Sequence, residues 1–343
     1  TSKKHELLNI YFYDENNKKT ILKENITVYK GTIIDTSFLS IRELYKFFEK
    51  QLKKCVDEKI LLSLHLKASM MKVSDPIIFG HMLKVYFKDF ILNNKKILSD
   101  LNVNFNSGLS ILYEKIESLE KDEKNRITKE LENVFLSSAE IAMVDSEKNI
   151  SNFHVPSDLI IDASMPAMIK SSGKMWNKNG ELKDTKAIIP DSTYASIYQA
   201  TIDFCKQKGA FDPSTMGTVQ NVGLMAKKAE EYGSHDKTFE IKKSGQIKVQ
   251  TKDGKTIASH IVEKGDIWRM CLVRKDAIKD WIKLAISRAK QTNFPTIFWL
   301  DKKRPHDFEI IKVVKKELKK INTSKIDIQI LSPYEAKIGR ARV

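Results

Sequence analysis

Apolar residues in the first 140 positions follow two periods, which predict strands and helices in succession. Residues 41–59 carry apolar residues at helical spacing behind Ser40, a residue type that caps helix N-termini. A second helix is predicted at 76–94, with Pro76 in its first turn, and two more within 109–136. Four short apolar runs have strand character: 7–14, 20–23, 26–29 and 60–67.

From about residue 140 the pattern changes to short apolar strands that alternate with helices. Residues 237–265 alternate with a period of two and contain the turn-forming Gly245 and Gly254, so an antiparallel hairpin is expected there. Helices are predicted at 192–209, 275–292 and 306–321. Further strands are predicted at 140–145, 158–164, 186–190, 266–273, 295–300 and 326–331.

These elements predict an α/β protein, with mixed sheets flanked by helices and an antiparallel hairpin insertion. We place a boundary near residue 140, where the pattern changes to short apolar strands that alternate with helices. Residues 1–139 then form a first α/β subdomain with a helical excursion, and residues 140–343 form a second. The sequence contains no internal repeat and no Gly/Pro-rich linker.

The composition is that of a globular protein, since 41% of the 343 residues are hydrophobic. No apolar run approaches the ~20 residues that span a bilayer, and the first residues do not resemble a signal peptide. The three cysteines, Cys55, Cys205 and Cys271, are too widely spaced for a metal site. The sequence therefore predicts a protein of the reducing cytoplasm without a membrane partner.

The net charge of +15 arises from 59 basic and 44 acidic residues, and the lysines are interleaved with acids. This pattern is more typical of solvated helix faces than of a nucleic-acid interface. We find no recognition-helix motif, zinc finger or RNA-binding aromatic signature. A non-catalytic basic module that binds nucleic acid or an acidic partner stays open as the alternative function.

Candidate chemistry lies at the carboxyl ends of two predicted strands, just past their apolar runs "LLSLHL" and "DLII". Neither GxGxxG nor GxxxxGK[ST] occurs, so a self-contained dinucleotide or P-loop site is not supported. In α/β sheets ligands bind outside the carboxyl ends of strands, which is where Lys67 and Asp162 stand. The carboxylate could bind Mg²⁺ or Mn²⁺, and the lysine could exchange protons if its pKa were lowered. The phenol of Tyr232 could donate a proton.

Each of these residues also has a purely structural interpretation. Asp162 is equally suited to cap the following helix, and Lys67 could extend over apolar surface with its ammonium in water. Tyr232 could be a packing residue. His65 and His81 are better explained as core or hydrogen-bonded histidines than as metal ligands. The residues alone therefore predict an α/β protein with an oxygen-ligand metal site.

Longer blocks of the sequence resemble the monomeric NADP-dependent isocitrate dehydrogenases. The resemblance is strong from about residue 60 to 333, looser before it, and lost in the last ten residues. The blocks that carry it are "LLSLHLKASMMKVSDPIIFGH", "HVPSDLIIDASMPAMIKSSGKMW", "NVGLMAKKAEEYGSHDKTFEI", "GDIWRMC" and "FWLDKKRPHD".

The resemblance implies an isocitrate/isopropylmalate dehydrogenase-like fold and a cytoplasmic, monomeric oxidoreductase of the tricarboxylic acid cycle and glyoxylate bypass. Its reaction oxidises isocitrate with NADP and releases CO₂ to give 2-oxoglutarate, with Mg²⁺ or Mn²⁺ bound. Asp162 in "DASMP" matches the metal-binding aspartate. Lys67 in "LHLKASMMK" matches the lysine that transfers a proton at the substrate hydroxyl. Tyr232 in "EEYGSHDK" matches the proton donor to the enolate.

The sequence also departs from the family pattern. The family's N-terminal Ser/Asn/Arg segment for the substrate carboxylates, its later Arg-Asp-x-x-x-Asp segment and its NADP-selecting His and Arg residues are not found here. We therefore expect a fragment, with both predicted subdomains belonging to one larger domain of the family enzyme. We assign no NADP-binding residue to this chain and expect little or no turnover by the chain alone. A domain that keeps the fold without activity is a further alternative.

Overall fold

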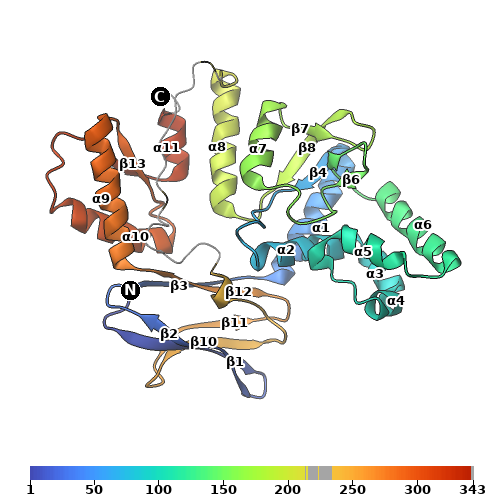
Figure 1. Ribbon diagram of the computed structural model, residues 1–343, viewed down its shortest axis with the longest axis horizontal. Coiled ribbons are helices and arrows are strands. Elements are labelled where there is room, and N and C mark those ends of the chain that lie inside the picture. Colours follow the sequence, from blue (N-terminus) through green and yellow to red (C-terminus); the bar gives the residue numbers. More distant parts are fainter. Residues whose placement is uncertain (213, 215–222, 224–233, 341–343) are drawn as a thin grey trace. The chain divides into compact units, whose positions relative to one another are not determined.

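The computed structural model describes residues 1–212, 214, 223 and 234–340 (Figure 1). These residues form two compact units, one of Thr1–Phe38 with Ser192–Val343 and one of Leu39–Asp191. The division differs from the predicted boundary near residue 140. The reason is strand pairing, because the first strand of the chain lies between its second strand and a strand from the region after residue 240.

The first unit contains a four-stranded antiparallel sheet in the order β11-β10-β1-β2. Its inner face carries alternate apolar residues, such as Ile10 opposite Val249, which pack against the fully buried Trp268. The pairing of β10 with β11 accounts for the period of two in this part of the sequence. The bounds are Glu6–Asp14 (β1), Lys19–Val28 (β2), Gly245–Thr251 (β10) and Thr256–Val262 (β11).

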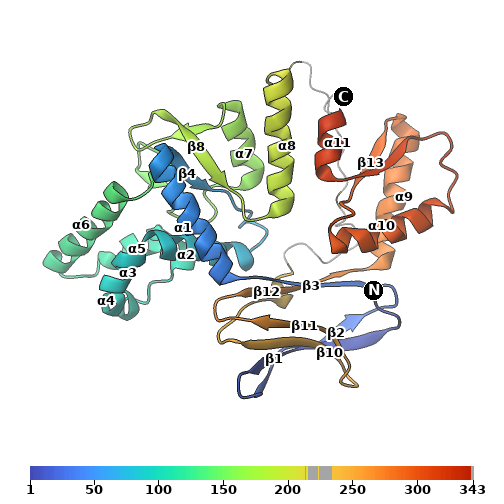
Figure 2. The same ribbon diagram turned by 180° about the vertical axis from the view of Figure 1, so that it is seen from behind.

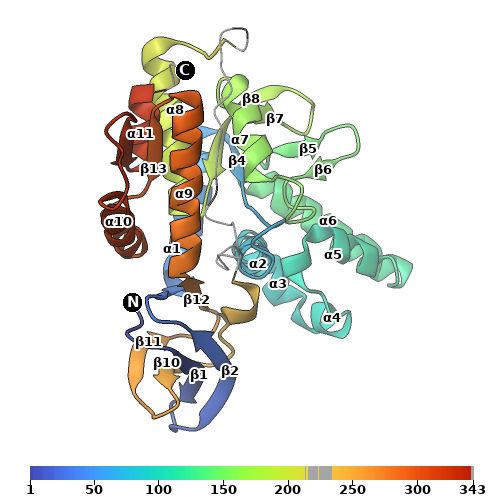
Figure 3. The ribbon, with the colours of Figure 1, turned by 60° about the vertical axis from the view of Figure 1, so that its left-hand side comes forward.

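A second group of elements in this unit packs around the parallel strands β13 and β14, of which Figure 3 labels β13. Helices α9 and α10 pack there through a core that includes Ile278, Ile282, Phe298, Ile310 and Val314. A three-stranded sheet in the order β3-β12-β9 completes the unit. The bounds are Ile33–Leu39 (β3), Ser192–Lys208 (α8), Thr238–Glu240 (β9), Ile267–Val273 (β12), Lys275–Thr292 (α9), Thr296–Trp299 (β13), Pro305–Leu318 (α10), Ile328–Leu331 (β14) and Pro333–Arg340 (α11).

The second unit is built around the sheet β4-β8-β7, in which β4 and β8 are parallel. Helix α7 lies on one side of this sheet (Figure 1) and helix α1 on the other (Figure 2). The bounds are Ile41–Glu58 (α1), Leu61–Leu64 (β4), Ser74–Tyr86 (α2), Lys88–Asn93 (α3), Lys95–Asp100 (α4), Leu109–Ile116 (α5), Lys121–Ser137 (α6), Met143–Asp145 (β5), Ile150–Ser151 (β6), Ile161–Lys170 (α7), Lys174–Trp176 (β7) and Leu182–Ile188 (β8).

Helix α1 shows how the sequence sets these elements. The Ser40 side chain accepts from the Glu43 N–H, which satisfies a backbone donor that the helix itself leaves free. The spacing of Leu44, Phe48 and Cys55 places all three on one buried face. The helix ends at Glu58, and the left-handed conformation of the C-cap residue Lys59 allows its N–H to reach back to two carbonyls of the last turn. The predicted helix behind Ser40 is confirmed.

One predicted strand is wrong. Residues 158–164 form no strand, because only Ile160 makes an isolated bridge, to Leu66, and helix α7 already begins at Ile161. A short apolar run does not show whether a segment is a strand or the start of a buried helix. Here the segment starts a helix, which buries Ile161 and Met165 on one face. Asp162 therefore lies in the first turn of a helix rather than at the end of a strand.

Several lysines of the described residues pair with acids three positions away, as the interleaved charges predict. Lys46 bonds to Glu43 at 2.9 Å and Lys320 to Glu317 at 2.9 Å. In each pair the lysine side chain is exposed to solvent, and surface pairs of this kind are typically worth less than about 1 kcal/mol. In the part of the chain that the structure describes, no helix combines the length and apolar character that crossing a bilayer requires.

Candidate functional site

The segment His65–Lys67 leaves strand β4 and runs beside the start of helix α7. The His65 N–H donates to the Ile188 carbonyl at 2.9 Å, which extends the β4–β8 pairing by one residue. Leu66 then bridges Ile160, and the Ile161 N–H donates to the Leu66 carbonyl at 2.8 Å. These backbone bonds place residue 67 next to the first turn of α7.

The side chains of Lys67 and Asp162 meet at this junction. Lys67 Nζ lies 2.9 Å from Oδ2 and 3.2 Å from Oδ1 of Asp162. The two residues are 95 positions apart in the sequence, so it is the fold that brings them together. The Lys67 side chain is 13% exposed and that of Asp162 is 49% exposed. At the start of α7 the helix dipole also favours a carboxylate.

The backbone of Lys67 is fixed at the start of another helix. Its N–H donates to Oδ2 of Asp75 at 2.8 Å, and its carbonyl accepts from the Met71 N–H at 2.8 Å. Asp75 is the second residue of α2. Asp75 was not among the predicted site residues, although an acid directly before Pro76 at a helix start is an available signal. Lys67 is therefore held both at its backbone and at its ammonium group.

His65 is buried below the same junction, with 1% of its surface exposed. Its Nδ1 lies 2.7 Å from Oγ of Ser164 in α7, and its Nε2 lies 2.6 Å from Oγ of Ser63 in β4. Burial lowers the pKa of His65 to about 4, so the imidazole is neutral at pH 7. The prediction of a hydrogen-bonded core histidine is confirmed for His65.

Asp162 fits one position in the coordination shell of a divalent cation. Its half-exposed carboxylate offers hard oxygen donors, which Mg²⁺ and Mn²⁺ prefer. Among the described residues no group of three or more His, Cys, Asp or Glu side chains could hold a metal. The remaining ligands would have to be substrate oxygens, water or side chains outside that part of the chain.

The junction brings together two of the three predicted site residues. Lys67 and Asp162 are in contact, whereas Tyr232 lies outside the described residues. A partly exposed carboxylate beside a nearly buried ammonium can bind a cation, attract an anionic ligand and exchange a proton with it. This combination suits the chemistry of an oxygen-rich anionic substrate better than it suits nucleic-acid binding.

The sequence places His306 directly before Asp307, but the structure does not arrange these two residues as a base with its orienting acid. Nδ1 of His306 faces Asp35 at 3.4 Å, and Asp307 bonds to Arg304 at 3.0 Å. The His306 contact holds the pKa of Asp35 below its usual value. The structure therefore gives these two neighbours different partners, as expected for side chains that point in different directions.

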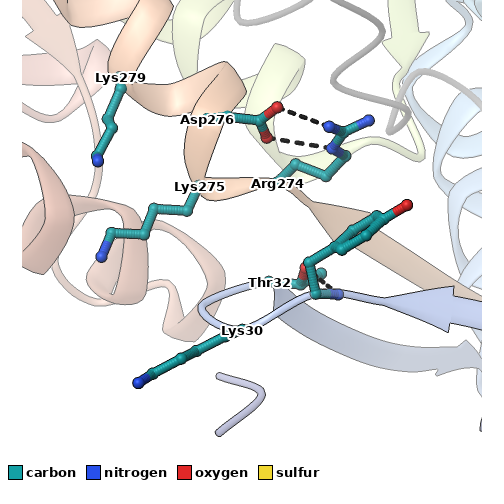
Figure 4. Close-up of a pocket in the computed structure, with 7 residues that line it drawn as sticks. Lys30, Thr32, Arg274, Lys275, Asp276 and Lys279 are labelled. Carbon is teal, nitrogen blue, oxygen red and sulfur yellow. Dashed lines mark hydrogen bonds and ion pairs between the residues drawn. The ribbon is translucent and has the colours of Figure 1, made fainter. Parts of the chain in front are cut away.

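A basic pocket lies within the unit that contains α9, and its chemistry differs from that of the junction. It encloses about 330 Å³. Figure 4 shows Arg274 turned toward Asp276, while Lys275 and Lys279 extend away from that pair. Lys320, Lys279 and Lys275 lower the pKa of the nearby Glu317. The lining residues are Tyr29, Lys30, Thr32, Arg274, Lys275, Asp276 and Lys279.

The lining of this basic pocket offers neither a metal ligand set nor an acid–base pair. Its one carboxylate, Asp276, is bonded to Arg274 through both oxygens, at 3.1 and 2.6 Å. The positive charges that remain belong to lysines, of which Lys275 and Lys279 lie near the carboxylate of Glu317. We therefore place the candidate active site at the Lys67–Asp162 junction and not at the basic pocket.

Comparison with known proteins shows the family to which the chain belongs. The family described as "Monomeric isocitrate dehydrogenase" matches residues 1–342. The chain is 49% identical over 325 residues to an isocitrate dehydrogenase [NADP] of Azotobacter vinelandii, covering 94% of this chain and 44% of that protein. It is 50% identical over 316 residues to isocitrate dehydrogenase [NADP] 2 of Mycobacterium tuberculosis, covering 92% of this chain and 42% of that protein.

A third relative is isocitrate dehydrogenase [NADP] 2 of Colwellia maris, 48% identical over 329 residues, which are 96% of this chain and 44% of that protein. The chain thus spans less than half the length of the curated relatives that it matches. The match covers nearly the whole chain, including the junction at Lys67 and Asp162. The resemblance inferred from the sequence blocks is confirmed, and this chain belongs to the monomeric isocitrate dehydrogenase family.

Proposed function

We propose that this chain supplies the substrate side of an NADP-dependent isocitrate dehydrogenase, which converts isocitrate to 2-oxoglutarate and CO₂. The observation that carries the proposal is the 2.9 Å contact between Lys67 and Asp162. Each belongs to a sequence block that resembles the family, and the fold joins these blocks across 95 positions. Family membership and names of relatives support the same reaction.

In this proposal Asp162 would hold Mg²⁺ or Mn²⁺, and that ion would supply Lewis-acid stabilisation of charge on the substrate oxygens. Lys67 transfers the proton of the substrate hydroxyl. While Asp162 lies beside it, the carboxylate favours the ammonium form of Lys67. To accept the hydroxyl proton, Lys67 would first have to release its own proton to solvent, and this release would be easier if Asp162 held a divalent cation instead of the ammonium.

The other parts of the proposal rest on the resemblance. Tyr232 donates the proton that converts the enolate to product, and the contacts to NADP lie mostly outside this chain. The β10–β11 pair is an insertion in a fold of the isocitrate/isopropylmalate dehydrogenase kind. We further propose a cytoplasmic enzyme that acts as a monomer on isocitrate, in the tricarboxylic acid cycle and the glyoxylate bypass.

A chimaeric enzyme tests the function. In it, this chain replaces the matching segment of the Azotobacter vinelandii relative, so that the rest of that enzyme supplies what the segment lacks. We expect NADPH formation, read at 340 nm, that requires both isocitrate and Mn²⁺. A chimaera that is folded by circular dichroism but gives no NADPH would contradict the proposal. The chain alone should give little or no NADPH under the same conditions.

A further inference from the structure

The hydrogen bonds of His65 run in one direction across the junction. Oγ of Ser164 lies 3.0 Å from the Ile160 carbonyl, to which its single O–H donates. With that proton used, we assign Ser164 as the acceptor of Nδ1–H of His65, at 2.7 Å. Nε2 of the neutral imidazole is then the acceptor for the O–H of Ser63, at 2.6 Å. The chain of donors thus runs from strand β4 into the first turns of helix α7.

This connection joins the same two segments as the ion pair. His65 lies two residues before Lys67, and Ser164 lies two residues after Asp162. Between these two contacts the Ile161 N–H donates to the Leu66 carbonyl at 2.8 Å. The three contacts therefore connect the same two short segments. A change in the His65–Ser164 bond should also change the distance between the Lys67 ammonium and the Asp162 carboxylate.

The uncharged state of His65 suits such a role. Its side chain is almost fully buried, and burial keeps the imidazole neutral near pH 7. A neutral imidazole does not compete with Lys67 for the carboxylate of Asp162. A buried residue that makes two side-chain bonds is also more rigid than the exposed side chains around it.

We infer that His65, bonded to Ser164, is a positioning residue that sets the Lys67 ammonium against the Asp162 carboxylate. The inference rests on the proposed function, but its geometric content concerns this chain alone. Loss of the bond should let α7 shift relative to the segment that carries Lys67. Since a misplacement of about 1 Å at a reacting group can cost about 100-fold in rate, a 10- to 100-fold loss of kcat is expected.

The first test uses the chain itself and needs no activity. Lysines are acylated with acetic anhydride under limiting conditions, and the rate at each lysine is read by mass spectrometry. In Ser164→Ala we expect Lys67 to be acylated at least threefold faster, because its hold on Asp162 is loosened. Lys186, which forms a similar ion pair with Glu58, should be unchanged.

Two control variants separate positioning from general loosening. Ser164→Thr keeps the hydroxyl and should restore the slow acylation of Lys67. Ser63→Ala removes the bond on the β4 side only, keeps the link to α7, and should change the rate at Lys67 less than twofold. An unchanged rate at Lys67 in Ser164→Ala, or an equal rise at Lys67 and Lys186, would overturn the inference.

The second test uses the chimaeric enzyme and distinguishes this inference from the proposed function. Ser164→Ala should lower kcat 10- to 100-fold and change KM for NADP less than twofold, and Ser164→Thr should recover most of kcat. If Lys67→Met abolishes turnover while Ser164→Ala leaves kcat intact, the function stands and the positioning role is refuted. If neither variant affects turnover, the proposed function itself fails.

Discussion

Two lysine–carboxylate pairs in the same unit have nearly the same local geometry. Lys67 lies 2.9 Å from Asp162, and Lys186 lies 3.0 Å from Glu58. The side chains are 13% and 49% exposed in the first pair, and 23% and 51% in the second. Distance and burial therefore do not explain why one pair would be a reaction centre and the other a structural contact.

The difference lies in the elements that carry the charges. Asp162 is in the first turn of α7, where the helix dipole favours an anion, whereas Glu58 is the last residue of α1, where it does not. Lys67 follows the end of β4, where ligands of α/β proteins bind, while Lys186 lies within β8. The comparison teaches that position at the ends of strands and helices, rather than the ion pair itself, marks the candidate site.

The sharpest contrast is expected from removing each ammonium in the chimaeric enzyme. Lys67→Met should lower kcat about 10³-fold, within the usual range for loss of an acid–base group. Lys186→Met should leave kcat within twofold, and steady-state kinetics with isocitrate and Mn²⁺ measure both. Equal losses in the two variants would remove the distinction between the pairs.

Replacing the carboxylate of each pair should affect the Mn²⁺ requirement of the enzyme differently. In the chimaera, Asp162→Asn should raise the Mn²⁺ concentration for half-maximal activity at least tenfold, because an amide is a weaker ligand for a hard cation than a carboxylate. Glu58→Gln should leave this concentration unchanged. A Mn²⁺ titration of NADPH formation checks both, and an unshifted midpoint in Asp162→Asn would exclude a metal-binding role.

The buried His65, which lies beside the Lys67–Asp162 pair, should make the free energy of unfolding depend on pH. Since burial lowers the pKa of folded His65 to about 4, against about 6.5 in an unfolded chain, only the unfolded state binds the proton between these values. Stability from this group is full above pH 6.5 and falls as the pH drops toward 4, by about 3 kcal/mol in all.

Urea unfolding at pH 7.0 and pH 4.5 measures this effect. The difference in unfolding free energy between the two pH values should be smaller in His65→Asn than in the unmodified chain, because the variant lacks the buried histidine. Other acid-sensitive groups are common to both proteins and cancel in the comparison. An identical pH dependence would mean that His65 is protonated alike in both states.

The smallest effect is expected on the free energy of unfolding when the Lys186–Glu58 pair is removed. Glu58→Gln removes a half-exposed ion pair at the surface, which should cost less than about 1 kcal/mol of unfolding free energy. Urea unfolding of this variant at pH 7 provides the measurement. A cost above about 2 kcal/mol would show that this contact is a major part of the unit's stability.

Much of the fold was predictable where apolar residues recur with one period over a long segment and where a capping residue marks the start of a helix. Helix α1, with Ser40 before it and apolar residues on one face, is the best example. The strand predicted at 158–164 was wrong because four apolar residues fit a strand or a helix start equally well. The contact that decides between them, Ile161 N–H to the Leu66 carbonyl, joins distant segments and is invisible to local pattern.

The candidate site was predictable only in part. Lys67 and Asp162 were named from their places beyond apolar runs and from the family blocks, and the fold brings them together. The bond between His65 and Ser164 was not predicted, because nothing in the sequence pairs two residues 99 positions apart. The sequence analysis likewise missed the division into units, which depends on β1 pairing with β10 rather than on a change of composition.

The most direct measurement asks whether Lys67 and Asp162 act as one centre. In the chimaeric enzyme, kcat is compared for Lys67→Met, Asp162→Asn and the double variant at saturating Mn²⁺ and isocitrate. Residues that act as a unit show strongly non-additive losses, so the double variant should be within about tenfold of the more impaired single variant. A loss equal to the product of the two single losses would show independent action and contradict a shared reaction centre.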